Sequence, residues 1–286
     1  MAPPSPVVAR WDLGRRLREK RELLGLTGAA GVRLVGLSPT FLSDVENGKK
    51  NLPEDKLEAM ITSFEFDTDE AAELRTLRIE AGQRGWWSQF GGLFAPEVLR
   101  MYGYEHGAKV VLSYDGSLVS GLLQTRDYAR AVIESGSPNV RLAEADRRVE
   151  ARMIRQRRLT GDDPLRLTAV MSEAVLHQQI GGPEVLLGQL RHLVTMMERL
   201  PDTLDVLIVP FSARGHAAMG GSFDLFTFPS PTLPGLAWQQ TLAAGEIVED
   251  PTMVREYSIA HASAVGVALN RSDSLGLIKQ RVKDLS

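Results

Sequence analysis

The sequence contains no cysteine among its 286 residues, and this absence excludes several kinds of chemistry. Disulfides, thiolate nucleophiles and cysteine zinc sites all require the missing residue. No apolar run approaches the roughly 18 residues that a membrane helix needs, and the first residues lack the charged and then apolar layout of a signal peptide. We therefore expect a cytoplasmic protein with no membrane association, and a reducing compartment is compatible with the lack of cysteine.

The motifs of common enzyme classes are missing as well. The histidines show no HExxH or HxxxH spacing, and there is no phosphate-binding loop, dinucleotide fingerprint or GxSxG motif. The adjacent carboxylates Asp162 and Asp163 lie between a glycine and a proline, where turn formation explains them better than acid–base catalysis does. We therefore expect no enzyme activity, no cofactor and no metal. A buried His216 within hydrogen-bonding reach of a carboxylate would favour the enzyme alternative.

The charge is distributed unevenly along the chain. The length indicates two domains at ~100 to 200 residues each, and the net charge is −3. Residues 10–50 contain nine lysines and arginines against five acids, whereas residues 54–80 contain three against nine. The basic segment could face phosphates while the acidic one faces elsewhere. Two solvated surfaces with random variation in charge are the alternative.

The first eighty residues show signals for five short helices after a flexible tail over residues 1–9. Leu13 and Leu17 share one face of a first helix at 10–24, and Gly25 ends it. Thr27 can cap a second helix that ends before Gly36. The other three are expected at 39–47 after Ser38, beyond Pro53 with apolar positions at 57, 60, 61 and 64, and after an Asp67–Glu70 capping box to about residue 82.

The third of these helices is expected to be the functional one. Short helices joined by turns of three or four residues are typical of the helix-turn-helix, whose second helix enters the major groove of DNA. Here that helix is 39–47, and it would bury Phe41, Leu42 and Val45. Residues 10–82 are therefore predicted to form an all-α, five-helix domain that binds double-stranded DNA.

Several phrases in this region resemble the phage-repressor-like, or XRE-type, helix-turn-helix family. They are Gly25-Leu26-Thr27, Gly36-Leu37-Ser38, Leu42-Ser43, Val45-Glu46-Asn47-Gly48-Lys49 and Pro53. The resemblance implies base-edge positions at Pro39, Thr40 and Asp44, to which we add Ser43 for limited base discrimination. It implies phosphate contacts at Ser38, Asn47, Lys49 and Lys50, with Thr27 at a helix N-terminus that favours phosphate. Arg21 and Glu46 match a structural pair that joins the first helix to the third.

The sequence also departs from the family pattern. Gly28 stands where a polar residue is usual, Gly31 where a core leucine is usual, and Val32 where a tight alanine is usual. Two helical glycines cost about 1 kcal/mol each relative to alanine, so the second helix is expected to be frayed or displaced. Asp44 stands where arginine or glutamine is common, and it repels phosphate. We therefore expect modest DNA affinity. A degenerate helix-turn-helix that binds protein is the alternative.

The rest of the chain is expected to be a linker at 83–96 and a larger domain at 97–286. Trp86 and Trp87 in the linker are expected to dock on a domain surface. Several strands follow one another without a helix between them, which favours an α+β fold with a mainly antiparallel sheet. The expected strands are 109–114, 165–171, 204–209, 223–228 and 236–242, and the expected helices begin near 125 or span 140–159, 182–200, 252–269 and 272–285.

The predicted helix at 140–159 is rich in arginine, with seven arginines against three acids between residues 141 and 158. We expect its arginines to be solvated and its packing to involve Leu142, Val149, Met153 and Ile154. A second phosphate-binding strip is the alternative.

Phrases across the larger domain are similar to the C-terminal domain of a group of actinomycete XRE-type regulators that is described as antitoxin-like. They are 83–87 (QRGWW), 121–125 (GLLQT), 127–129 (DYA), 147–150 (RRVE), 180–183 (IGGP), 209–211 (VPF) and 215–216 (GH). The resemblance implies a regulator that commonly acts beside a small partner protein encoded nearby. We therefore predict a homodimeric, sequence-specific DNA-binding transcriptional regulator whose C-terminal domain senses a ligand or such a partner. An antitoxin-like interaction module with weak or lost DNA binding is the alternative.

Overall fold

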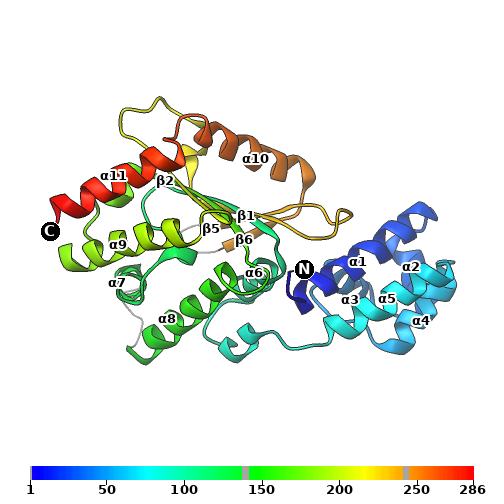
Figure 1. Cartoon of the computed structure of the whole chain (residues 1–286). Helices are drawn as coiled ribbons and strands as arrows, with labels where there is room; N and C mark the ends of the chain where they lie inside the picture. The colour runs from blue at the N-terminus through cyan, green and yellow to red at the C-terminus, as the bar shows by residue number, and fades with distance from the viewer. Residues whose placement is uncertain (1, 137–141, 241–244) are drawn as a thin grey trace. The chain divides into compact units, whose positions relative to one another are not determined.

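The computed structural model describes residues 2–136, 142–240 and 245–286 (Figure 1). The chain divides into two compact units, which are described separately below. The smaller unit is Pro3–Gln89, and the larger unit contains Phe90–Ser286. The division therefore lies within the stretch 83–96 that the sequence indicates as a linker.

The smaller unit is all-α, and the local signals in the sequence place most of its helix ends correctly. The side-chain oxygens of Thr27, Ser38 and Asp67 accept hydrogen bonds from the backbone N–H groups three residues later, as N-caps do. The buried core contains Leu17, Leu57 and Phe64. Its five α-helices are α1 (Pro6–Leu23), α2 (Gly28–Val35), α3 (Pro39–Glu46), α4 (Glu54–Ser63) and α5 (Thr68–Ala81).

The start of α1 corrects the prediction of a flexible tail over residues 1–9. The helix begins at Pro6 rather than at residue 10, and Ser5 caps it. Ser5-Pro6 supplies the same start signal as Ser38-Pro39, because proline fits the first helical position. Val7 and Ala9 are buried, so packing holds this extra turn in place.

The larger unit contains a six-stranded sheet surrounded by helices. Two of its elements, α6 and β6, were not predicted. The ends of two predicted elements, at residues 140–141 and 241–242, lie outside the described residues. The strands are β1 (Val110–Asp115), β2 (Arg166–Ser172), β3 (Leu204–Val209), β4 (Phe223–Thr227), β5 (Leu236–Gln240) and β6 (Gly245–Val248). The α-helices are α6 (Pro96–Gly107), α7 (Arg126–Gly136), α8 (Leu142–Gln156), α9 (Pro183–Arg199), α10 (Pro251–Val265) and α11 (Arg271–Asp284), and short 3₁₀ helices include η1 (Trp86–Phe90), η3 (Arg157–Leu159) and η5 (Ala217–Gly220).

The sheet is mixed, so the prediction of a mainly antiparallel sheet is only partly right. The strand order is β3-β2-β1-β4-β5-β6. Strands β1, β2 and β3 pair in parallel, whereas β4, β5 and β6 continue the sheet in antiparallel pairs. Parallel neighbours need a crossover connection. Helices α7 and α8 supply it between β1 and β2, and α9 supplies it between β2 and β3.

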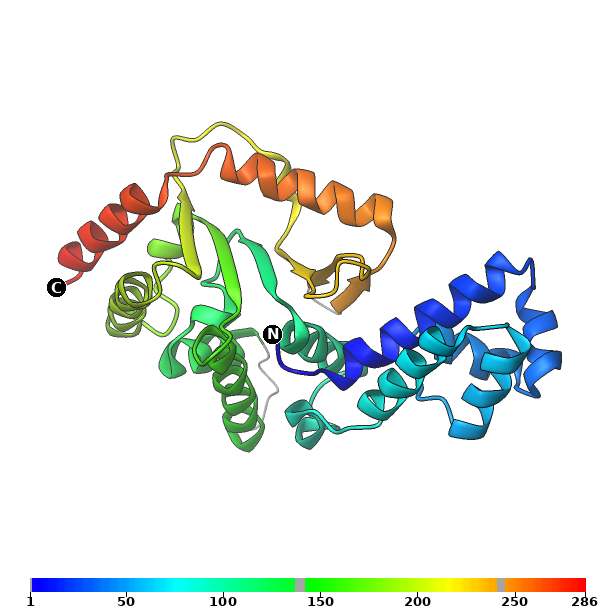
Figure 2. The same ribbon diagram turned by 45° about the vertical axis from the view of Figure 1, so that its right-hand side comes forward.

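Helices cover both faces of this sheet. Helix α10 lies on one side, and α7 and α8 lie on the other (Figures 1 and 2). Helices α9 and α11 pack against each other and against the edge strand β3. Among the helices that are described, none is both long enough and apolar enough to cross a membrane.

Candidate nucleic-acid interface

Helices α2 and α3 form the two helices of a helix-turn-helix. Gly36 ends α2 in the left-handed conformation, at a φ of 65°, and its N–H donates to the carbonyl of Val32. Helix α3 begins at Pro39, three residues beyond Gly36, with its cap at Ser38. Leu42, Val45 and Glu46 are buried on the inner face of α3. The opposite face of α3 is therefore left at the surface of the smaller unit.

The residues predicted to contact DNA gather around this outer face. Asp44 and Asn47 are half-buried, and the other predicted residues are exposed. The exposed ones are Thr27, Ser38, Pro39, Thr40, Ser43, Lys49 and Lys50. The fold therefore leaves seven of the nine side chains exposed, and six of the nine have hydrogen-bond or ion-pair partners within the unit.

Asp44 and Lys50 form an ion pair, which the sequence reasoning missed. The Lys50 Nζ lies 2.9 Å from a carboxylate oxygen of Asp44 and 5.6 Å from the centre of the Phe41 ring. The backbone N–H groups of Lys49 and Lys50 both donate to the carbonyl of Asp44, at 2.7 and 3.2 Å. This turn folds Lys50 back toward Asp44. The pair neutralises one of the two lysines that were expected to meet phosphate.

Asn47 is also engaged within the unit. Its side-chain amide donates to the carbonyl oxygen of Ser43 at 2.8 Å and to the Ser43 hydroxyl at 3.2 Å. Its side-chain oxygen accepts from the guanidinium of Arg18 on α1. Asn47 thus fixes the C-terminal end of α3 to α1.

Lys49 and Arg33 are two exposed cations of the helix-turn-helix and the turn that follows it. Both side chains are exposed, and among the described residues neither forms an ion pair or a side-chain hydrogen bond. Sequence reasoning assigned Lys49 to phosphate but missed Arg33 on α2. The available signal was a basic residue in an otherwise small and apolar helix.

Arg21 and Glu46 join α1 to α3 through a buried, two-pronged ion pair. The Nε–Oε1 distance is 2.6 Å and the Nη2–Oε2 distance is 3.0 Å, and each residue is 7% exposed. The hydrogen bond to Glu46 raises the pKa of Arg21. Arg21 Nη1 also donates to the carbonyl of Leu26, at 2.6 Å, which holds the turn before α2.

The Arg21 side chain also explains the unusual Gly31. A Cβ at Gly31 would lie 2.9 Å from Cδ of Arg21, so the arginine stem occupies space that a larger side chain would need. Helix α2 keeps its full length from Gly28 to Val35 with both caps formed. The predicted fraying is therefore not seen.

Two glycines allow α3 and its C-terminal turn to approach α1 closely. A Cβ at Gly14, in the middle of α1, would lie 2.1 Å from the carbonyl oxygen of Val45. Gly48 has a φ of 62°, and its Cβ would lie 2.7 Å from Cα of Trp11. No side chain fits at either backbone contact. The sequence signal for this contact is Gly14, a glycine within an otherwise strong helix.

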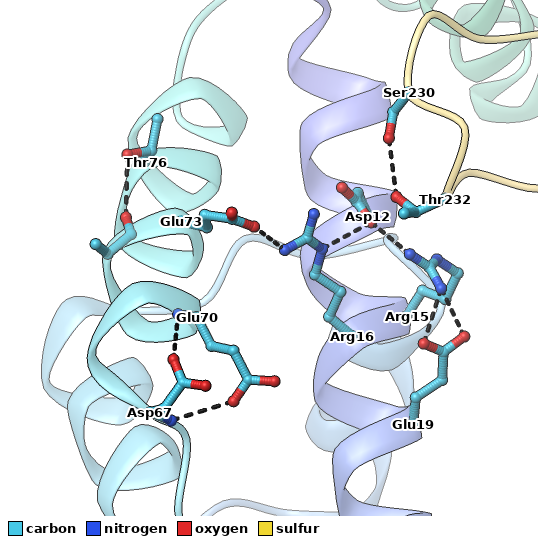
Figure 3. A network of polar contacts seen from close by, with 11 residues as sticks. Asp12, Arg15, Arg16, Glu19, Asp67, Glu70, Glu73, Thr76, Ser230 and Thr232 are labelled. Atoms are coloured by element: carbon cyan, nitrogen blue, oxygen red, sulfur yellow. Dashed lines mark hydrogen bonds and ion pairs between the residues drawn. The ribbon is translucent and has the colours of Figure 1, made fainter.

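Ion pairs also engage Arg15 and Arg16 of α1 (Figure 3). Arg16 bridges Asp12 on its own helix and Glu73 on α5, and Arg15 pairs with Asp12 at 2.9 Å and Glu19 at 2.6 Å. These arginines contributed to the basic count for residues 10–50. The positive charge that is free to meet a phosphate backbone is therefore smaller than that count implies.

The larger unit shows different surroundings for the residues singled out in the sequence. His216 Nε2 lies 3.4 Å from the Tyr114 hydroxyl, and the contacts found for this ring include no carboxylate. Within the described residues, no cluster of three or more histidines and acids could hold a metal. Val149 on α8 is buried as expected, but so is Arg155, which corrects the prediction that the arginines of this helix are solvated.

Two family models match the chain. The helix-turn-helix domain matches residues 12–74, and the domain of unknown function DUF5753 matches residues 98–280. No curated protein and no solved structure matches. The helix-turn-helix domain indicates a DNA-binding regulator. The second match covers more than half of the chain, which therefore belongs to the DUF5753 family.

Proposed function

We propose that the protein is an XRE-type transcription regulator that binds duplex DNA sequence-specifically through α3. The observation that carries this proposal is the two-sided character of α3. Its inner face is fixed by Leu42, Val45 and the Arg21–Glu46 pair, while Thr40 and Ser43 on its outer face are exposed. A rigidly held helix with a free polar face is what reading a major groove requires.

The contacts expected from this face are few. Thr40 and Ser43 would meet base edges, and Lys49 and Arg33 would meet phosphates. The N-termini of α2 and α3 add backbone N–H groups and the positive ends of helix dipoles, which favour phosphate. Because Lys50 is paired with Asp44, affinity should be modest and should depend on a small number of phosphate contacts.

Two copies of the chain would place their α3 helices about one turn of DNA apart on a roughly palindromic site. The larger unit would then sense a ligand or a small protein partner and alter the spacing of the two DNA-binding units. This proposal includes no catalytic role, and it places the protein in the cytoplasm with its DNA.

A second candidate is an antitoxin-like interaction module whose DNA binding is weak or lost. The Asp44–Lys50 pair favours it, because it lowers the positive charge of the face. Leu34 on α2 is 52% exposed, which also suits a protein partner. In this case the helix-turn-helix surface would bind protein rather than phosphate.

Fluorescence anisotropy of the full chain with duplexes from the DNA that flanks its own gene separates the two candidates. A regulator should bind at least one duplex without a partner, and affinity should fall steeply between about 50 and 200 mM salt. Arg33→Gln and Lys49→Gln should each weaken binding, whereas Lys109→Gln, an exposed lysine of the larger unit, should not. Indifference to every duplex in dilute buffer would exclude the regulator proposal.

A further inference from the structure

Three arginines on α8 lie along its inner face in the larger unit. Arg148, Arg152 and Arg155 are spaced at i, i+4 and i+7, which places them on one side of the helix. Arg155 has a full partner. Its Nε and Nη2 donate to the two carboxylate oxygens of Glu105 on α6, at 2.8 and 2.6 Å, and both side chains are buried. Glu105 is therefore already paired with Arg155.

Among the described residues, Arg148 and Arg152 donate hydrogen bonds only to neutral groups, and neither forms an ion pair. Arg152 Nη1 donates to Oε1 of Gln124 at 2.6 Å. Arg148 Nη2 donates to the carbonyl of Leu93 at 3.0 Å, its guanidinium lies 5.0 Å from the centre of the Phe94 ring, and its Nε is buried without an acceptor. Two partly buried positive charges thus lack a directly bonded anion, an arrangement that costs free energy.

The Arg152 guanidinium is held in place. Gln124 is buried, and its side-chain amide donates to the carbonyl of Val119 at 2.7 Å, which turns its oxygen toward Arg152. Burial and the neighbouring Arg155 lower the pKa of Arg152 to about 10, so it stays charged at neutral pH. A fixed, charged guanidinium presents its N–H groups to an anion with little loss of conformational entropy.

The nearby acids do not supply the missing charge. Asp115 at the end of β1 and Asp224 on β4 form no ion pair with the arginines of α8 in the described structure. Burial and the proximity of Asp224 raise the pKa of Asp115 well above its usual range. Burial, together with Glu105, raises the pKa of Asp224 to about 7. Asp224 is therefore only partly ionised at neutral pH, and burial disfavours the charged form of Asp115.

Arg148 and Arg152 line a cavity of about 490 Å³ in the larger unit. The remaining wall is largely apolar and includes Phe94, Leu118 and Ile133. A volume of ~300 to 1,000 Å³ with apolar walls and a few fixed polar groups is typical of a small-molecule site. The cavity thus combines largely apolar walls with two guanidinium groups.

We propose that this cavity binds an amphipathic anion, a small molecule with a carboxylate or phosphate head and an apolar body. The head would accept charge-assisted hydrogen bonds from Arg148 and Arg152, because a guanidinium matches both groups geometrically. The body would pack against Phe94, Leu118 and Ile133. Binding itself does not depend on DNA, whereas a role of the anion as a regulatory signal rests on the function proposed above.

The first test compares head groups on one apolar chain. Octanoate, octyl phosphate and 1-octanol are titrated into the full chain by isothermal calorimetry, below their micelle concentrations. At least one anion should bind saturably with one site per chain and about tenfold more tightly than 1-octanol, as expected for a charge-assisted contact. The ratio of the two anions identifies the preferred head. Equal binding of 1-octanol, or no saturable binding of either anion, would overturn the proposal.

The second test removes the cations one at a time. Arg148→Met and Arg152→Met should each weaken the preferred anion about tenfold and leave 1-octanol unchanged. The matched control is Arg157→Met, an exposed arginine beyond the end of α8 that loses the same charge and should have no effect. Arg152→Lys should recover part of the loss, because it keeps the charge but not the planar fork. An equal loss in Arg157→Met would contradict a local site.

The two tests give a decision even if a variant fails to fold, and they do not depend on DNA binding. If the methionine variants do not fold, as judged by circular dichroism, the comparison of head groups on the unmodified chain decides the question. Because the titrations contain no DNA, their failure would leave the proposed DNA-binding function standing, and a failure of DNA binding would leave the anion site standing.

Discussion

The two units of this protein each contain a buried arginine–glutamate pair, but the surroundings of the two pairs differ. Arg21 in the smaller unit is matched by Glu46 and by the carbonyl of Leu26, and no other arginine is buried there. In the larger unit Arg155 is matched by Glu105, but Arg148 and Arg152 lie beside it without a carboxylate. In the smaller unit the paired charges of Arg21 and Glu46 hold α3 in one position against α1. Excess charge in the larger unit leaves electrostatic attraction available to a ligand.

The largest expected effect follows from removing the acid of each pair. Glu105→Gln would leave Arg155 uncompensated beside two other arginines, so the larger unit should lose about 4 kcal/mol of unfolding free energy. Glu46→Gln should cost the smaller unit about 2 kcal/mol, because Arg21 keeps its bond to Leu26. Urea unfolding, followed by probes that report on each unit, measures both values.

The control for this comparison is to remove both charges at once. In Glu105→Gln combined with Arg155→Met, no uncompensated charge remains at the pair, so part of the lost stability should return. If Glu105→Gln cost no more than Glu46→Gln, the view that the larger unit has an excess of buried positive charge would be wrong.

The next effect concerns the close contact between α1 and α3 in the smaller unit. Gly14→Ala would place a methyl group 2.1 Å from the carbonyl oxygen of Val45, so the helices must separate. We expect a loss of about 3 kcal/mol. Gly28→Ala is the control, since nothing lies within 4 Å of its added Cβ. That change should stabilise the unit by about 0.5 kcal/mol, because alanine restricts the unfolded chain. Thermal melts of the two variants should therefore shift in opposite directions.

The two units also differ in how much of their structure could be predicted from the sequence. The ends of α2 to α5 were predictable because they depend on local groups: Thr27, Ser38 and Asp67 as caps, and Gly36 in a left-handed turn. The parallel half of the sheet was not predictable in this way. It depends on pairing between strands that are far apart in the sequence, such as Ser113 with Ala169 and Leu167 with Leu204.

The candidate sites show the same division between local and non-local information. The family resemblance located the outer face of α3, but not the ion pair of Asp44 with Lys50, which depends on the turn after α3. The spacing of Arg148, Arg152 and Arg155 was visible in the sequence. By itself this spacing predicts a solvated face, because polar helix faces usually point to water. Only the contacts of α8 with other elements, such as Arg155 with Glu105 on α6, show that this face points inward.

Asp224 should make the stability of the larger unit depend on pH. Its pKa in the folded state is raised to about 7, whereas an unfolded aspartate titrates near 4. Between those values the folded chain holds a proton that the unfolded chain releases, so stability falls as pH rises through this window. Asp224→Asn should remove this contribution and make the larger unit about 2 kcal/mol more stable than the parent at pH 8.

The measurement for Asp224 is urea unfolding at a series of pH values from 4 to 8. The exposed Asp202→Asn, with the same change of charge, should follow the parent curve. Parallel curves for Asp224→Asn and the parent would show that Asp224 is ionised throughout, and the neutral form inferred for it beside the α8 arginines would have to be abandoned.

The smallest expected effect tests whether charge balance in the smaller unit limits DNA binding. Asp44→Asn should release Lys50 and remove a carboxylate that repels phosphate, so duplex affinity should rise about fivefold and the salt dependence should steepen by about one phosphate contact. Asn can also bond to adenine, so Asp44→Ala is measured alongside it, and a gain from released charge appears in both variants.

Asp69→Asn, exposed on α5, controls for net charge. Adding Lys50→Gln to Asp44→Asn should cancel the gain. If Lys50→Gln alone weakened the parent as much as Lys49→Gln does, the ion pair would have to open on DNA, and Asp44 would not limit affinity.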